Sequence, residues 1–173
     1  MRNQWLIGAI VCATLAIATS AAAEDGSANE RPDITPFVFL GSNASWGVGA
    51  AVRWPLAGPL SVEAETSYRR SAVSPLNANV SLLFDFPQFG RITPYVAGGI
   101  GLDQYAFADT SSTGQIVTQA GTALSVNAGG GVRVRSTENW GIRTDARWSN
   151  GLGGRAPERW RVYNGVTFGR QGR

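Results

Sequence analysis

The chain has 173 residues, enough for one domain, and its 15 basic residues against 12 acidic ones give a formal net charge of +3. All the basic residues are arginine, there is no histidine, and the only cysteine is Cys12. The missing histidine removes the commonest general base and metal ligand, which argues against most hydrolytic and metal-dependent activities. The arginines are scattered through strand-like segments and form no basic patch, so we expect no nucleic-acid partner.

Residues 1–23 are typical of a secretory signal peptide. Arg2 precedes a largely apolar stretch from Trp5 to Ala18, and three alanines at 21–23 follow it. An apolar core of about 14 residues is shorter than the roughly 20 that a transmembrane helix needs. We therefore expect cleavage after Ala23, which leaves a mature chain without cysteine and without disulfides.

Residues 24–34 are polar and acidic and predict a flexible lead-in, after which polar and apolar residues alternate along the chain. No segment sustains a 3.6-residue apolar period, so we predict almost no helix beyond the signal peptide. A mature chain without a long apolar stretch can cross lipid only as a closed barrel of strands. The alternation predicts eight strands, at about 35–42, 46–54, 60–69, 77–86, 93–105, 122–134, 140–149 and 159–169.

The predicted connections alternate in length, apart from a short link at 43–45. Turns rich in Pro, Gly, Ser or Asn lie at 55–59, 87–91 and 135–139, and longer links lie at 70–76, 108–121 and 150–158. Short turns at one end and long loops at the other are typical of an up-and-down outer-membrane barrel, with the short turns in the periplasm.

Aromatic residues recur at a spacing of eight along the predicted strands. Eight strand residues extend roughly 26 Å along the chain and roughly 20 Å along a membrane normal once tilted, close to the height of a barrel's apolar band. Aromatic side chains at the two ends of such a band form girdles at the membrane interfaces. The predicted girdle residues are Trp46, Trp54, Tyr68, Trp140, Trp148, Trp160 and Phe168.

The opposite face of each strand mixes small residues with arginines and carboxylates of nearly balanced charge. A lumen of low dielectric needs such balance, whereas a solvated face does not. We therefore place this face inside, although a soluble, lipocalin-like barrel with the faces reversed is an alternative. Arg69 and Asp103 lie on the same face, and Asp145 and Arg161 are expected at similar heights. The predicted lumen charge network is Arg53, Glu63, Glu65, Asp85, Arg133, Arg143, Asp145, Arg147 and Arg161.

The stretch Thr93-Pro94-Tyr95-Val96-Ala97-Gly98-Gly99-Ile100-Gly101, together with the glycine-rich Asn127–Arg133, resembles the small outer-membrane β-barrel family that includes OmpX-, Ail- and OmpA-barrel-like proteins. The resemblance covers residues 34–169 and implies an all-β fold: an eight-stranded antiparallel up-and-down transmembrane β-barrel in the cell outer membrane. It also implies two partners, outer-membrane lipid and the outer-membrane assembly machinery. Family members commonly end on an aromatic residue; here Phe168 takes that place, with the barrel at 35–169 and a short tail at 170–173.

For function, we predict a structural or surface-interaction role with a lumen plugged by side chains, and no enzymatic activity, catalytic residue, cofactor or metal. Barrel enzymes of this class generally rely on a His-assisted nucleophile, which this chain lacks. Glu63 and Glu65 lie roughly 7 Å apart on one strand face, a spacing that could suit the carboxylate pair of a glycosidase. We favour a structural role for them, as partners of neighbouring arginines in internal salt bridges. The link at 108–121 is the expected contact surface for a surface ligand. The alternatives are a narrow channel for ions or small solutes and a soluble periplasmic binding barrel.

Overall fold

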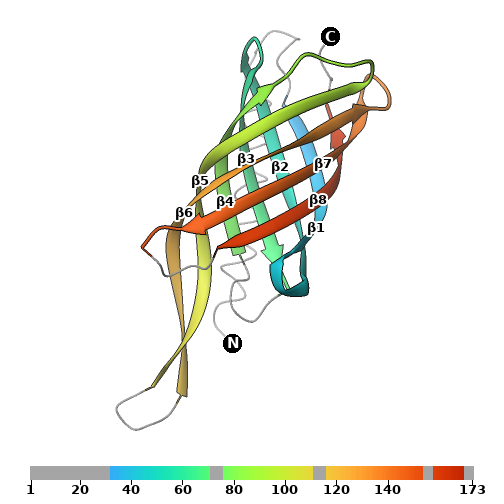
Figure 1. Ribbon diagram of the computed structural model, residues 1–173. Helices are drawn as coiled ribbons and strands as arrows, with labels where there is room; N and C mark the ends of the chain where they lie inside the picture. The colour runs from blue at the N-terminus through green and yellow to red at the C-terminus, as the bar shows by residue number, and fades with distance from the viewer. Residues whose placement is uncertain (1–31, 71–75, 111–115, 154–157, 170–173) are drawn as a thin grey trace.

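The computed structural model describes residues 32–70, 76–110, 116–153 and 158–169. They form a closed barrel in which each strand pairs antiparallel with its neighbours in sequence and the last strand pairs with the first (Figure 1). This confirms the predicted eight-stranded up-and-down barrel. The strands are β1 (Asp33–Gly41), β2 (Ser45–Ala57), β3 (Leu60–Arg69), β4 (Leu76–Asp85), β5 (Ile92–Thr110), β6 (Ile116–Arg135), β7 (Trp140–Gly151) and β8 (Arg159–Phe168), and the 3₁₀ turn η1 (Ser42–Ala44) connects β1 to β2.

The barrel closes where β1 meets β8, in a register that runs from Ile34 opposite Phe168 to Gly41 opposite Arg161. The start of β1 and the end of β8 therefore lie at the same end of the barrel, called the terminal end below; the opposite end is the loop end. β1 begins at Asp33, two residues before the predicted start at 35. The predicted signal peptide at 1–23 and the tail at 170–173 lie outside the described residues.

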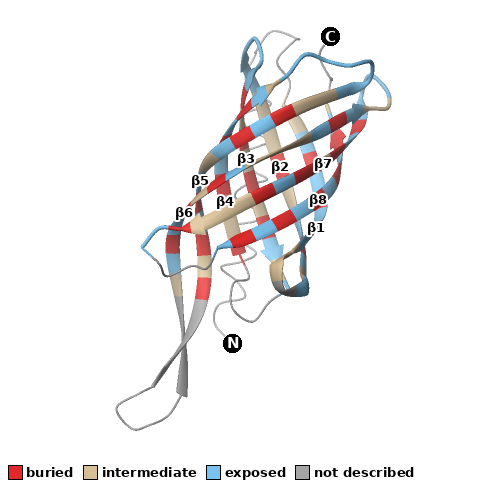
Figure 2. Cartoon of the chain, in the orientation of Figure 1, coloured by how far each residue is buried: buried red, intermediate tan, exposed pale blue. Residues whose placement is uncertain are grey.

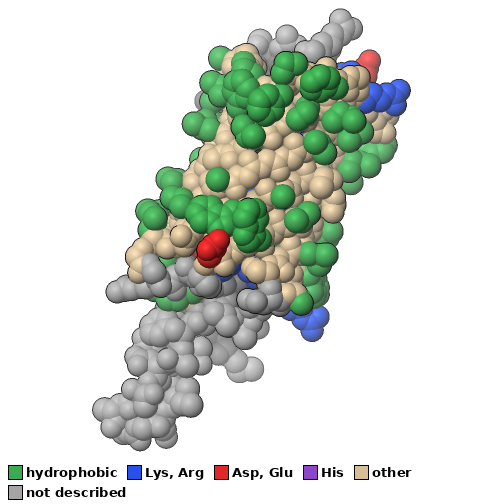
Figure 3. Space-filling view, viewed as in Figure 1, with side chains coloured by type: hydrophobic (Ala, Val, Ile, Leu, Met, Phe, Trp, Pro, Cys, Tyr) green, Lys and Arg blue, Asp and Glu red, His purple; other side chains and the backbone are tan. Residues whose placement is uncertain are grey.

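Side chains alternate between the lumen and the outer surface (Figure 2). In β8 every second residue from Arg159 to Thr167 is buried, and the residues between them are exposed. The exposed set is apolar, with Leu40 at 70% and Val38 at 60%, while the buried set includes charged residues such as Glu63 at 0%. The predicted facing is therefore confirmed: the polar face lines the lumen, and exposed hydrophobic side chains lie on the outer surface, one face of which is seen in Figure 3.

The connections at the terminal end are tight. The predicted five-residue turn at 55–59 is shorter in the structure, because β2 continues through an irregular register between Pro55 and Ala57. Only Gly58 and Pro59 then connect β2 to β3, and Gly58 adopts φ +55°, a conformation that favours glycine. Within the described residues, no helix is long and apolar enough to cross a membrane.

The prediction of a loop over 108–121 is wrong for most of its length. β5 and β6 remain paired as far as Thr110 opposite Ile116, whereas β4 leaves β5 at Asp103 and β7 leaves β6 at Ser125. Residues 104–110 and 116–124 therefore form a two-stranded ribbon that projects beyond the loop end (Figure 1). Seven strand residues extend roughly 23 Å. The small polar residues of this segment weaken the apolar alternation, but they do not prevent backbone pairing.

We predict that Phe168, rather than the tail, holds the last strand in place. Phe168 lies opposite both Ile34 of β1 and Trp140 of β7, so it contributes to both seams of β8. Phe168→Ser should lower the fraction of protein that migrates as the folded, heat-modifiable band on unheated gels. Deletion of residues 170–173 should leave that band unchanged. Loss of the band on tail deletion alone would reverse the assignment.

Candidate functional site

The centre of the lumen holds an ion-pair network between two strands that are not neighbours. Glu63 projects inward from β3, and Arg143 and Arg147 project from the facing wall, β7. Both carboxylate oxygens of Glu63 accept from Arg143, with Nη2 to Oε1 at 3.1 Å, and Oε1 also accepts from Arg147 Nη2 at 2.6 Å. The three side chains are at most 1% exposed. One carboxylate thus holds two guanidinium groups across the barrel.

Asp145 is the second carboxylate of this network. It lies between the two arginines on β7, with Oδ2 at 3.0 Å from Arg143 Nη2 and Oδ1 at 3.2 Å from Arg147 Nε. Oδ2 also accepts from the hydroxyl groups of Tyr95 at 2.5 Å and Tyr163 at 3.0 Å. Two carboxylates balance two guanidinium groups, and hydrogen bonds occupy the remaining acceptor positions, the condition under which buried charges are tolerated.

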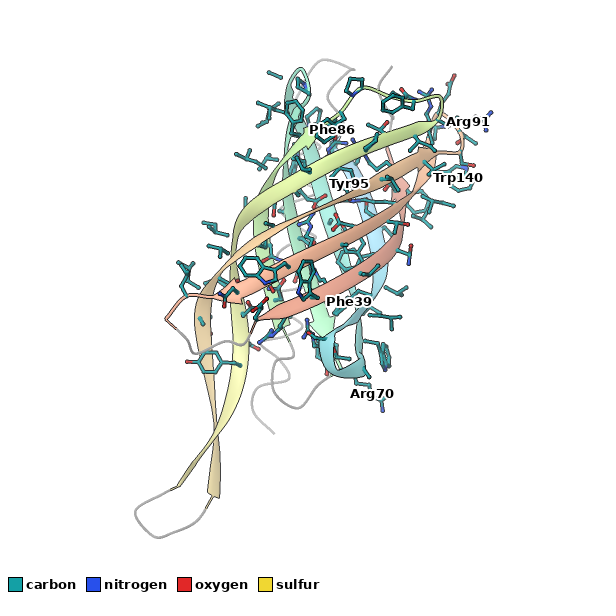
Figure 4. The ribbon with its side chains drawn as sticks, viewed as in Figure 1. Phe39, Arg70, Phe86, Arg91, Tyr95 and Trp140 are labelled. Atoms are coloured by element: carbon teal, nitrogen blue, oxygen red, sulfur yellow. The ribbon has the colours of Figure 1, made fainter. Side chains whose placement is uncertain are left out.

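Aromatic rings that were not among the predicted lumen residues line the same region. The guanidinium carbon of Arg143 lies 4.8 Å from the ring centre of Tyr95 and 5.3 Å from that of Tyr163. Phe37 stacks on Tyr163 with ring centres 4.4 Å apart, and Figure 4 shows Tyr95 and Phe39 within the barrel. The alternation along each strand could have placed these rings in the lumen, because they lie at inward-facing positions like the lumen charges.

Glu65 continues the network toward the loop end. Its Oε1 lies 2.5 Å from Arg161 Nη1 on β8, and its Oε2 lies 3.5 Å from Arg147 Nη1. The expected proximity of Asp145 and Arg161 is not observed, because the register places Asp145 opposite Tyr163 and Arg161 opposite Arg147. Because Arg161 is two residues away from the position opposite Asp145, it forms its ion pair with Glu65 instead.

A separate cluster lies at the terminal end. Asp85 Oδ2 accepts from Arg53 Nη2 at 2.5 Å, and Asp85 Oδ1 forms an ion pair with Arg133 Nη2 at 2.5 Å. Arg53 also lies 3.6 Å from Asp33. The predicted lumen charges therefore divide into this cluster and the central network, and Asp33 joins the cluster without having been predicted. Within the described residues, no group of three or more His, Cys, Asp and Glu side chains is arranged to hold a metal ion.

The seven aromatic residues predicted for the girdle lie near the two ends of the strands. Trp140 lies opposite Phe168 at the terminal end, and Trp148 lies opposite Trp160 at the loop end. Trp148 is half-buried and donates its indole N–H to Glu158 at 2.6 Å. Five of the seven are exposed on the outer surface and two, Trp54 and Trp148, are half-buried; the exposed ones are Trp46, Tyr68, Trp140, Trp160 and Phe168.

No protein-family model and no curated protein sequence matches the chain. Among solved structures, the N-terminal β-barrel domain of Pseudomonas aeruginosa OprF matches with a TM-score of 0.66 at 18% identity, covering 81% of this chain and 96% of that one. The chain has the fold of the small outer-membrane β-barrels.

Two other structures on this fold bear on function. Ail, the attachment invasion locus protein of Yersinia pestis, in complex with the heparin analogue sucrose octasulfate, matches at a TM-score of 0.52 and 13% identity, covering 79% of this chain and 96% of that one. The outer-membrane enzyme PagL matches at a TM-score of 0.51 and 12% identity, covering 79% of this chain and 98% of that one. The same barrel therefore occurs in an attachment protein and in an enzyme, so the fold does not decide the function.

We predict that the central network is required for stability. Glu63→Ala leaves Arg143 and Arg147 with one carboxylate fewer in a water-poor lumen, and it should lower the free energy of unfolding by about 3–5 kcal/mol. Glu138→Ala, in the exposed turn before β7, is the matched control and should change it by less than about 0.5 kcal/mol. Urea titrations of the refolded barrel measure both. Equal, small effects of the two substitutions would show that the network contributes little.

Proposed function

We propose that the chain is an integral outer-membrane protein with a structural or surface-interaction role and a lumen closed by side chains. The observation that carries this proposal is the distribution of polarity: apolar side chains cover the outside of a closed barrel and ion pairs fill its inside. A large contiguous apolar surface is unfavourable in water and favourable against acyl chains. A soluble periplasmic barrel would need the opposite arrangement.

The filling of the lumen favours the plugged barrel over the channel. Arg143, Arg147, Glu63 and Asp145 cross the centre with side chains that are nearly inaccessible to solvent. A small polar cavity, with about 20 Å³ of space for the centres of water-sized molecules, lies beyond them toward the loop end. An eight-stranded barrel has an interior just wide enough for side chains, so these residues occupy the path that ions would take.

The surface-interaction role is assigned to the β5–β6 ribbon. Among the described residues, β5 pairs with β4 only as far as Asp103 and β6 pairs with β7 only as far as Ser125, so the outer edges of the ribbon are not covered by a neighbouring strand of the barrel. Such edges accept an additional strand from another chain. If the loop end faces outward, as the short turns at the terminal end suggest, the ribbon is the part of the barrel that extends farthest from the cell.

The proposal includes export by a cleaved signal peptide at 1–23. It also includes insertion by the outer-membrane assembly machinery, with Phe168 as part of the recognition signal. An enzymatic role is the less favoured function, although PagL has the same fold. The chain contains no histidine to activate a nucleophile, and the carboxylates Glu63 and Glu65 are held in ion pairs with arginine.

We predict that Ala50, at the middle of β2 on the outer face, lies against acyl chains. Ala50→Arg should destabilise the protein in lipid vesicles by about 2–4 kcal/mol, because a charge near the bilayer midplane is costly. Ala51→Arg is the paired variant: Ala51 is 1% exposed inside the lumen, in a cluster with Phe37 and Tyr163, so its effect should come from crowding. Refolding titrations in vesicles that found Ala50→Arg neutral would contradict the assigned facing.

We predict that the purified protein in planar bilayers shows no steady conductance. Glu65→Ala removes the carboxylate that Arg161 and Arg147 share, so it should lower stability and introduce small, brief openings. Glu138→Ala should behave as the unmodified protein does. A stable, ion-selective current from the unmodified protein would favour the channel over the plugged barrel.

A further inference from the structure

A polar cavity lies between the central network and the loop end of the barrel. The cavity has a volume of about 20 Å³, or about 300 Å³ when its solvent-open part is included. Its lining contains three guanidinium groups and only one carboxylate. The lining residues are Arg69, Asn77, Asn79, Asp103, Asn127, Arg147, Ser149 and Arg161.

Arg69 differs from the other arginines of the lumen. Those at 53, 133, 143, 147, 159 and 161 each have a carboxylate oxygen within 4.0 Å. Among the described residues, Arg69 has no such partner; its guanidinium carbon lies 5.6 Å from the ring centre of Phe39. The ring positions the charge by a cation–π contact but does not neutralise it.

Both carboxylates nearest this cavity are already engaged. Asp103 accepts from Asn77 at 2.7 Å and lies 3.4 Å from Arg159, and Glu65 pairs with Arg161 and Arg147. The connecting segments at the loop end that lie outside the description, 71–75, 111–115 and 154–157, contain no Asp or Glu in the sequence. The cavity therefore carries an excess positive charge that these parts of the chain do not balance.

We propose that this cavity is a binding site for a tetrahedral oxyanion, a phosphate or sulfate group, held by Arg69 and Arg161. A guanidinium group presents paired N–H donors that match two oxygens of such an anion. The amide groups of Asn77, Asn79 and Asn127 and the hydroxyl of Ser149 are neutral donors in the same lining. The anion enters from the loop end and supplies the negative charge that Arg69 lacks.

The group can be free phosphate or the terminal phosphate of a lipid headgroup, because the site recognises only the shared oxyanion. The site is a property of the folded barrel and goes beyond the proposed surface role. Binding in detergent micelles therefore tests it whether or not the protein resides in a bilayer.

The experiment uses the full mature chain refolded in an uncharged maltoside detergent. Arginine Nε–H signals are followed by NMR while inorganic phosphate, then sulfate, replaces chloride at constant ionic strength. We expect saturable shifts of the Arg69 and Arg161 signals. Arg69→Gln should weaken binding at least about tenfold, because it removes charge-assisted hydrogen bonds to the anion. The affinity of Arg69→Lys for the anion should lie between those of the unmodified protein and Arg69→Gln.

Arg70→Gln is the matched control. Arg70 follows Arg69 directly, but its guanidinium lies 5.6 Å over Trp46 on the outer surface, and Figure 4 shows it beyond the loop end of the barrel. Binding should change less than twofold in this variant, and both variants should keep the heat-modifiable band. Absence of saturable shifts with inorganic phosphate, with sulfate and with a phosphate-headed lipid alike, or equal weakening by Arg69→Gln and Arg70→Gln, would overturn the proposal. Mixed micelles containing a phosphate-headed lipid distinguish the sources: shifts with the lipid but not with inorganic phosphate identify the headgroup.

Discussion

The narrow lumen of an eight-stranded barrel is the constraint on which the rest of the structure depends. A charge that points inward cannot reach bulk water, so it must find its counter-charge inside the barrel. Glu63 and Asp145 do this by each contacting both Arg143 and Arg147. Such sharing requires a cation with several donors in one plane, which arginine provides and lysine does not. A chain whose basic residues are all arginine is suited to this interior.

The same narrowness determines where large and small inward residues alternate. Phe37 lies opposite Gly49, and Phe39 lies opposite Gly47, in the register of β1 and β2. A Cβ atom at either glycine would overlap the facing phenyl ring. These glycines are therefore required for space and not for a turn, and they let two rings enter a lumen that β3 and β7 fill with charges. The apolar packing and the ion-pair network meet at Tyr163, which stacks on Phe37 and donates its hydroxyl to Asp145.

The strands and their facing could be predicted from sequence because the two-residue period is a local property. Ion pairing across the lumen could not, since the contact of Glu63 with Arg143 joins non-adjacent strands and depends on the stagger with which the barrel closes. Arg161 lies two residues along β8 from Tyr163, the residue opposite Asp145, and it pairs with Glu65 of β3 instead. The ribbon of β5 and β6 was missed for another reason: a hairpin outside the barrel has no buried face to impose alternation.

The sequence identity to solved barrels is low because this fold requires a pattern of residue types more than particular residues. The outer surface requires only apolar residues at alternate positions, and many sequences satisfy that pattern equally well. Structures that share the fold can therefore differ at more than four positions in five, as the 18% identity to the OprF barrel illustrates. The charged residues of the lumen cannot vary independently, because substituting one of them leaves its ion-pair partner without a counter-charge. Properties particular to this chain should accordingly reside in the lumen and at its loop end, and not on the apolar outer surface. At the loop end, Arg69 has no carboxylate partner among the described residues.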